Sequence, residues 1–172
     1  MTGEASGMEG TAIDYIIQLL DIPRYYYLIA AVTAVVVGGI TRKWSLGLLA
    51  GYCEFVLAVT VFSRVPAAAA QYELRLFWSY AHPELWLEDA VNVAAYVPVG
   101  ALGARLWGRR AVLFGLGLSA ASELLQLMGH RGLFELDDLF HNTVGTALGC
   151  LAFLLVWRLT QWINPQRAEK KR

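Results

Sequence analysis

Carboxyl and amide side chains occur at helical spacing in two segments of the chain that are otherwise almost entirely apolar. Glu123 and Gln126 are three positions apart, and Asp138 and Asn142 are four positions apart. Residues with these separations lie on the same face of a helix. Each pair therefore places an acid beside an amide, a combination that can bind a polar ligand or, with a suitable partner, transfer protons.

A short turn joins these two segments and carries an arginine. It brings Arg131 close to Glu123, Asp137 and Asp138, and a planar guanidinium pairs bidentately with carboxylates. We therefore expect Arg131 to be clamped between these acids. Together with polar residues at the matching ends of earlier segments, the candidate binding residues are Arg64, Asn92, Glu123, Gln126, Arg131, Asp137, Asp138 and Asn142.

These residue types support several roles. In a binding site, the two arginines would recognise an anionic head group by bidentate contact. In an enzyme, Glu123 and Asp138 would be an acid–base pair, although no nucleophile with a base beside it is evident. In a purely structural role, the polar side chains would join neighbouring helices by hydrogen bonds. A metal held by Asp137, Asp138 and His141 is a further alternative, but we predict neither a resident metal nor a cofactor.

The composition indicates that these side chains lie in a membrane protein. Of the 172 residues, 57% are apolar and 16% are charged, against about 25% charged in soluble domains. The mean hydropathy is +0.47, and the net charge of zero does not favour nucleic acid as a partner. A spanning helix needs roughly 17–25 mainly apolar residues. We predict an all-α integral membrane bundle of about five transmembrane helices, from charge-poor segments at 25–41, 44–63, 90–104, 111–122 and 139–157.

The basic residues predict how the bundle is oriented. With the N-terminus outside, ten Lys and Arg residues lie at cytoplasmic ends and four lie outside. This distribution follows the positive-inside rule, so we predict an N-out, C-in topology with the acid-rich loops facing outward. The predicted parts are an extracytoplasmic lead-in with an interfacial helix as one alternative (1–24), an added N-terminal transmembrane helix (25–43), a transmembrane core (44–162) and a basic cytoplasmic tail (163–172).

Three blocks of sequence resemble the VanZ-like family of bacterial membrane proteins. They match in order and spacing over roughly residues 50–158, and the first span lies outside this shared part. The third block is the most specific, because it combines most of the candidate binding residues. The blocks are Thr60-Val-Phe-Ser-Arg64 with Glu73 to Tyr80, Glu88-Asp-Ala-Val-Asn92 with Tyr96-Val-Pro-Val-Gly100, and Ser122-Glu-Leu-Leu-Gln126 with Arg131, Glu135-Leu-Asp-Asp138 and Asn142-Thr-Val-Gly145.

The resemblance implies a multi-pass protein of the bacterial cytoplasmic membrane. It also implies an accessory role in cell-envelope defence, of the kind that protects against the glycopeptide teicoplanin. The expected partners are then membrane lipids, a lipoglycopeptide antibiotic or a lipid-linked envelope precursor, bound in an outward-facing polar pocket. The alternative is a membrane enzyme that acts on a lipid-linked envelope substrate with Glu123 and Asp138 as acid and base.

Overall fold

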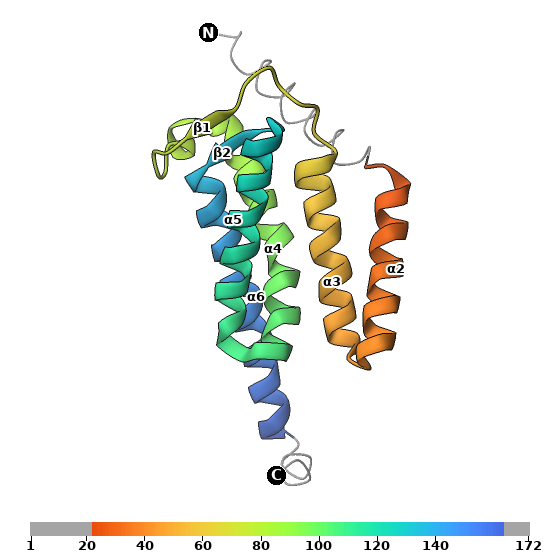
Figure 1. Ribbon diagram of the computed structural model, residues 1–172. Coiled ribbons are helices and arrows are strands. Elements are labelled where there is room, and N and C mark those ends of the chain that lie inside the picture. The colour runs from red at the N-terminus through yellow and green to blue at the C-terminus, as the bar shows by residue number, and fades with distance from the viewer. Residues whose placement is uncertain (1–21, 164–172) are drawn as a thin grey trace, which may run out of the picture.

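The computed structural model describes residues 22–163, which form a helical bundle with folded loops at one end (Figure 1). The predicted lead-in, 1–24, and basic tail, 163–172, lie almost wholly outside the described residues. The helices are α2 (Arg24–Thr41), α3 (Trp44–Leu57), α4 (Trp86–Trp107), α5 (Ala111–Gly129) and α6 (Leu136–Ile163). The shorter elements are a π-helical turn (Ala58–Phe62), 3-10 turns (Ser79–Ala81, Pro83–Leu85 and Gly108–Arg110) and strands β1 (Gln71–Glu73) and β2 (Leu133–Glu135).

Four segments of the described chain are long and apolar enough to cross a membrane: Arg24–Thr41, Trp44–Phe62, Pro83–Gly129 and Leu136–Ile163. The third contains both α4 and α5, which run antiparallel on either side of a tight turn (Figure 1). Gly108 starts that turn with a φ of 59°, a conformation that favours glycine. In residues 22–163, five helices therefore stand side by side, which confirms the predicted all-α membrane bundle.

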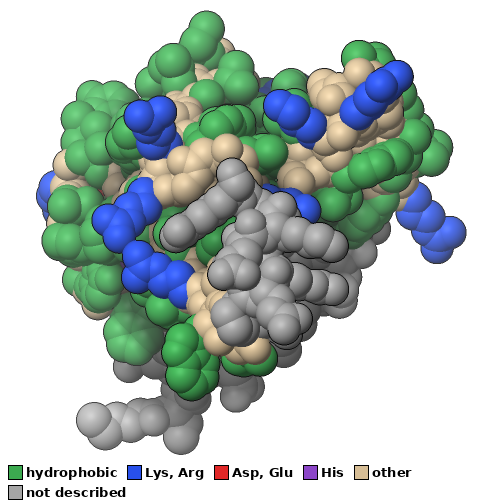
Figure 2. Space-filling model, turned by 90° about the horizontal axis from the view of Figure 1, so that it is seen from below, with side chains coloured by type: hydrophobic (Ala, Val, Ile, Leu, Met, Phe, Trp, Pro, Cys, Tyr) green, Lys and Arg blue, Asp and Glu red, His purple; other side chains and the backbone are tan. Residues whose placement is uncertain are grey.

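The two ends of the bundle differ in charge. Seen from the end where α2 meets α3, the surface shows Lys and Arg side chains and no Asp or Glu side chain (Figure 2). We call this the basic end, and the opposite end, with residues 63–85 and 130–135, the loop end. The separation fits the predicted N-out, C-in topology, in which the loop end faces outward; that orientation stays a prediction. The basic residues in the helix ends and turns here are Arg42, Lys43, Arg105, Arg109, Arg110 and Arg158.

Glycines bring α4 and α6 into very close contact. A Cβ atom at Gly149 would lie 1.9 Å from the backbone O of Val97, and one at Gly145 would lie 2.1 Å from the O of Val93. Small residues allow helices to approach in this way within a membrane, where packing replaces the hydrophobic effect. The Gly145–Gly149 spacing is thus used within the chain.

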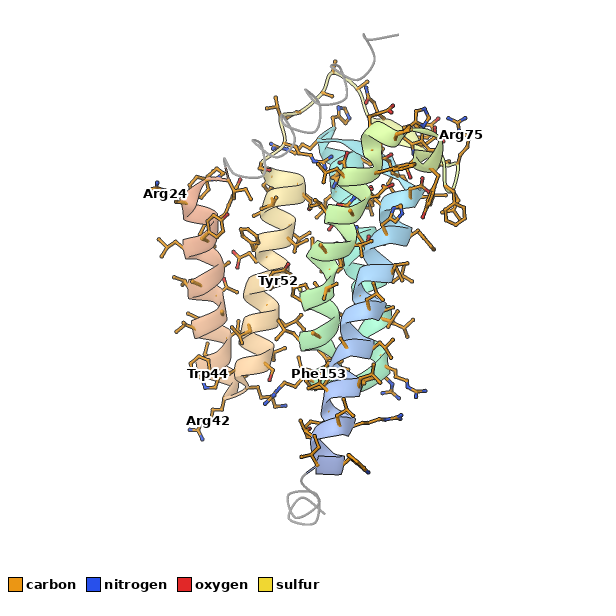
Figure 3. The ribbon with its side chains drawn as sticks, turned by 180° about the vertical axis from the view of Figure 1, so that it is seen from behind. Arg24, Arg42, Trp44, Tyr52, Arg75 and Phe153 are labelled. Carbon is orange, nitrogen blue, oxygen red and sulfur yellow. The ribbon has the colours of Figure 1, made fainter. Side chains whose placement is uncertain are left out.

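A second pair of helices, α2 and α3, packs beside this core (Figure 1). A Cβ atom at Gly51 would lie 2.3 Å from the backbone O of Ala30 in α2, so small residues again set the helix spacing. Tyr52 points from α3 toward α4 (Figure 3) and donates a hydrogen bond from its hydroxyl to the O of Ala95 at 2.9 Å. Among the described helices, α2 contacts mainly α3 and lies at the edge of the bundle.

The loop end contains a short parallel β-ladder. β1 pairs with β2, with Gln71 opposite Leu133 and Glu73 opposite Glu135. The sequence predicted only helices and loops here, so this strand pairing was not expected. Its effect is to tie the long connection between α3 and α4 to the start of α6, directly above the candidate site.

Candidate functional site

The predicted site residues all lie toward the loop end, but most of them are not accessible. Glu123, Gln126, Asp137, Asp138 and Asn142 are each 1–6% exposed. Arg64, Asn92 and Arg131 are partly exposed. The arrangement is therefore a buried polar network with a partly exposed edge, rather than an open pocket.

Direct hydrogen bonds link α4, α5, α6 and β2 within this network. The Asn92 Nδ2 atom donates to Oδ1 of Asp138 at 2.8 Å, which joins α4 to α6. The Asn142 Nδ2 atom donates to Oγ of Ser119 at 2.9 Å, which joins α6 to α5. The backbone N of Glu135 donates to Oε2 of Glu123 at 3.1 Å. Part of the network thus holds the helices together, as the structural interpretation predicted.

Two acceptors in the network have no partner in the described part of the chain. They are Oε1 of Gln126 and Oδ1 of Asn142, and both are fully buried. Buried polar atoms are nearly always hydrogen-bonded, and leaving one unpaired costs about 1–3 kcal/mol. A network that served only to join helices would be expected to satisfy them.

Arg64 is a basic residue that lies beside the acids of this network. Its Nη2 atom lies 3.4 Å from Oε1 of Glu88, and its charge also acts favourably on Glu123, Glu135 and Asp138. The single guanidinium of Arg64 therefore partly compensates the charge of four carboxyl groups. The network is rich in hydrogen-bond acceptors and poor in donors.

Glu135 stands in β2, outside the spanning helices, and its acidity is strongly altered. Burial first, and then the nearby Glu88 carboxylate, raise the pKa of Glu135 from its ordinary 4.5 to about 7. The indole Nε1 of Trp78, which donates to Oε1 of Glu135 at 3.0 Å, and the Arg64 guanidinium oppose this rise in pKa. This carboxyl group thus exchanges its proton near neutral pH.

Asp137 holds the folded loop in place. It is 1% exposed, and its carboxylate accepts hydrogen bonds from the backbone N atoms of Phe77 and Ser79, the latter at 2.9 Å. Phe77 has a φ of 66°, a strained value for a bulky residue. Both carboxylate oxygens of Asp137 therefore fix the backbone of the loop at Phe77 and Ser79.

The expected clamp of Arg131 between carboxylates is wrong. Its Nη1 atom donates to the backbone O atoms of Phe62 at 3.1 Å and Arg64 at 2.9 Å. Within the described residues no carboxylate lies within 4 Å of it. The cause is the end of α5, where His130 is left-handed with a φ of 53° and the N of Arg131 donates to the O of Gln126 at 2.8 Å. This turn directs the side chain toward α3 and away from α6.

The structure does not assemble the metal site considered for Asp137, Asp138 and His141. The first two carboxylates bond the loop amides and Asn92. The Nδ1 of His141 lies 3.3 Å from Oδ1 of Asp89, although at an angle that makes no hydrogen bond. In the described part of the chain, no group of three or more potential ligands is suitably placed for a metal ion.

A groove lies apart from the network, between α2 and the continuous helix formed by α3 and the π-helical turn. Its volume is about 460 Å³. Among the described residues that line it, Glu54 has the one acidic or basic side chain. Tyr26 and Ile29 line it from α2, and Cys53, Leu57 and Phe62 line it from the other side.

One family of known proteins matches most of the chain. The model of the VanZ/LLP1 family covers residues 27–158. The chain belongs to this family. No curated protein and no solved structure matches the chain. The match confirms the resemblance seen in the three motif blocks, and it includes α2 from residue 27 onward. At the level of the family, it supports a membrane accessory protein in glycopeptide resistance.

Sequence reasoning missed two members of the network in this VanZ/LLP1 protein. Glu88 pairs with Arg64, and Glu135 bonds Trp78 through its side chain and Glu123 through its backbone. Both glutamates stand in the motif blocks and at the mouth of a span. Their place in the motif blocks could have indicated that they belong to the network. Acids at the mouth of a span usually face water, however, so this position alone does not predict burial.

Proposed function

We propose that this VanZ/LLP1 protein is an accessory protein of cell-envelope defence that binds the polar part of a lipid or lipoglycopeptide at the loop end. The observation that carries the proposal is the pair of buried, unpartnered acceptors, Oε1 of Gln126 and Oδ1 of Asn142. A ligand that brings hydrogen-bond donors would satisfy them and offset the cost of their burial.

The electrostatics of the network support a ligand rich in donors. Four carboxyl groups gather around Arg64, so hydroxyl, amide or amino groups of a ligand would find acceptors there. Arg64 and Glu88 are the accessible edge, with side chains 35% and 26% exposed. Entry from the loop end requires these two residues to separate, and their 3.4 Å contact is a partly exposed pair that costs little to break.

The substitution Gln126→Leu tests the proposal. If Oε1 of Gln126 has no partner without ligand, a leucine of similar size leaves the protein equally stable or more stable. Protection against teicoplanin, measured as growth of a sensitive bacterial host that expresses the chain, is expected to fall to that of cells without the protein. Gln71→Leu, at an exposed position in β1, is the matched control and keeps protection.

Loss of protection together with loss of folded protein would show a structural role for Gln126. Full protection by a stable Gln126→Leu variant would refute the proposal. Glu123→Gln separates binding from catalysis, because the amide keeps an acceptor for the backbone N of Glu135 but cannot transfer a proton. A binding protein then retains most of its protection, whereas an enzyme that uses Glu123 as acid or base loses it.

A further inference from the structure

The groove between α2 and α3 extends toward the loop end. From Ala50 to Phe62 it follows α3 and the π-helical turn over twelve residue steps, or about 18 Å at 1.5 Å per residue. Its walls are largely apolar, and its volume of about 460 Å³ is within the usual range for small-molecule sites. The shape suits a long apolar chain that lies parallel to the helices.

Arg131 stands at the upper end of this groove. Its Nη1 atom bonds the carbonyl of Phe62, a residue that lines the groove. Tyr26, on the opposite wall, is close enough to Arg131 to interact electrostatically with it. The apolar groove and the guanidinium are therefore parts of one surface.

The charge of Arg131 is not compensated by the described residues around it. Its two hydrogen bonds go to neutral backbone carbonyls, and its Nη2 and Nε atoms have no acceptor in the described part of the chain. The charge of Arg64, in contrast, is compensated by the four acids around it. A guanidinium that is fixed in position and has no ion pair among residues 22–163 suits a phosphate, because its donors match two phosphate oxygens.

We infer that the groove binds an acyl chain of an anionic phospholipid whose phosphate contacts Arg131. This inference rests on the proposed function, because it names the class of lipid and adds an apolar half to the site. The two halves fit one molecule: the phosphate complements the unpaired guanidinium, and the chain fills the groove below it. Inorganic phosphate could contact Arg131 but would leave the apolar groove empty, so a phospholipid is the better fit.

Lipid retention by the purified full-length chain tests the inference. Native mass spectrometry compares phosphatidylglycerol with phosphatidylcholine of identical acyl chains, and the wild type is expected to retain the anionic lipid preferentially. Arg131→Gln is expected to lower retention of phosphatidylglycerol about tenfold, from loss of a charge-assisted pair. Retention of phosphatidylcholine is expected to fall less, because its choline ammonium already compensates the charge of its phosphate. Leu57→Trp fills the groove and leaves Arg131 intact, so it is expected to lower retention of both lipids.

Two matched controls accompany these variants. Leu48→Trp changes another leucine of α3, which is 53% exposed and does not line the groove. Arg75→Gln changes an arginine at the loop end on the side opposite α2 (Figure 3), where it pairs with Glu73. Both controls are expected to retain lipid as the wild type does.

Equal retention of the two lipids by the wild type would overturn the inference, as would equal effects of Leu57→Trp and Leu48→Trp. Loss of binding in Glu54→Gln but not in Arg131→Gln would also overturn it, because the polar contact would then lie deep in the groove. If lipid retention behaves as expected while Gln126→Leu keeps teicoplanin protection, the proposed function alone fails. If protection depends on Gln126 but Arg131 and Leu57 do not affect lipid retention, the groove inference alone fails.

Discussion

The contact between α4 and α6 leads to a quantitative prediction for Gly149→Ala. The new Cβ atom would lie 1.9 Å from the O of Val97, 2.8 Å from its C atom and 3.0 Å from the N of Ala101. A carbon and a carbonyl oxygen approach to about 3.3 Å at closest in ordinary packing, so the helices must separate by about 1.4 Å. All three obstructing atoms are backbone atoms, which cannot move aside alone.

Such overpacking costs about 1–3 kcal/mol, and alanine returns up to about 1 kcal/mol through its higher helix propensity. Because α4 and α6 are in more extensive contact than any other two described helices, we expect the upper part of this range and a net loss of about 2 kcal/mol. Gly117→Ala is the matched control, since nothing lies within 4 Å of its Cβ position in α5. It is expected to be neutral or slightly stabilising.

The measurement is the free energy of unfolding in mixed micelles, followed by tryptophan fluorescence during titration with a denaturing detergent. Gly149→Ala is expected to unfold at a lower detergent fraction than the wild type, and Gly117→Ala at an equal or higher one. Equal stability of Gly149→Ala and the wild type would refute the close approach of α4 and α6. An equal loss in both variants would show that glycine is needed for another reason.

Two further predictions concern the loop end. Asp137→Asn leaves one backbone donor of the loop without an acceptor, so the free energy of unfolding is expected to fall by about 2 kcal/mol and residues 63–85 to become sensitive to protease; an unchanged cleavage rate would contradict the role of Asp137 as the anchor. For Glu135, the pKa is about 7 in the folded protein against an ordinary 4.5, so folding takes up a proton. Its contribution to stability is complete below pH 4.5 and is lost as the pH rises to about 7. Glu135→Gln is expected to flatten this part of the stability–pH curve, and an unchanged slope would contradict the assigned pKa.

The bundle was predictable from sequence because lipid imposes a simple rule. Each spanning helix requires a long charge-poor segment, and those at 25–41 and 44–63 correspond closely to α2 and to α3 with its π-helical turn. The helical spacing of Glu123 and Gln126 likewise predicted that they share one face of a helix, and both are buried on α5. These features depend on local sequence and on the solvent, and neither requires knowledge of the tertiary contacts.

The partners of the arginines were not predictable in the same way. The direction of Arg131 depends on one left-handed residue, His130, and a histidine gives little indication of such a conformation. The pairing of Arg64 with Glu88 joins residues 24 positions apart, across a loop whose path is fixed by the β-ladder and by Asp137. Long-range contacts of this kind follow from the folded loop, which hydropathy does not describe.

The two proposed binding regions differ in charge because the two arginines have different surroundings. Four carboxyl groups lie around Arg64 and would repel an anion placed beside it. Arg131 is held by neutral carbonyls and keeps its charge available. Since Nη1 of Arg131 lies 2.9 Å from the O of Arg64, the anion-binding and donor-binding regions adjoin. An amphiphile with a phosphate, hydrogen-bond donors and an acyl chain therefore complements both regions and the groove at once.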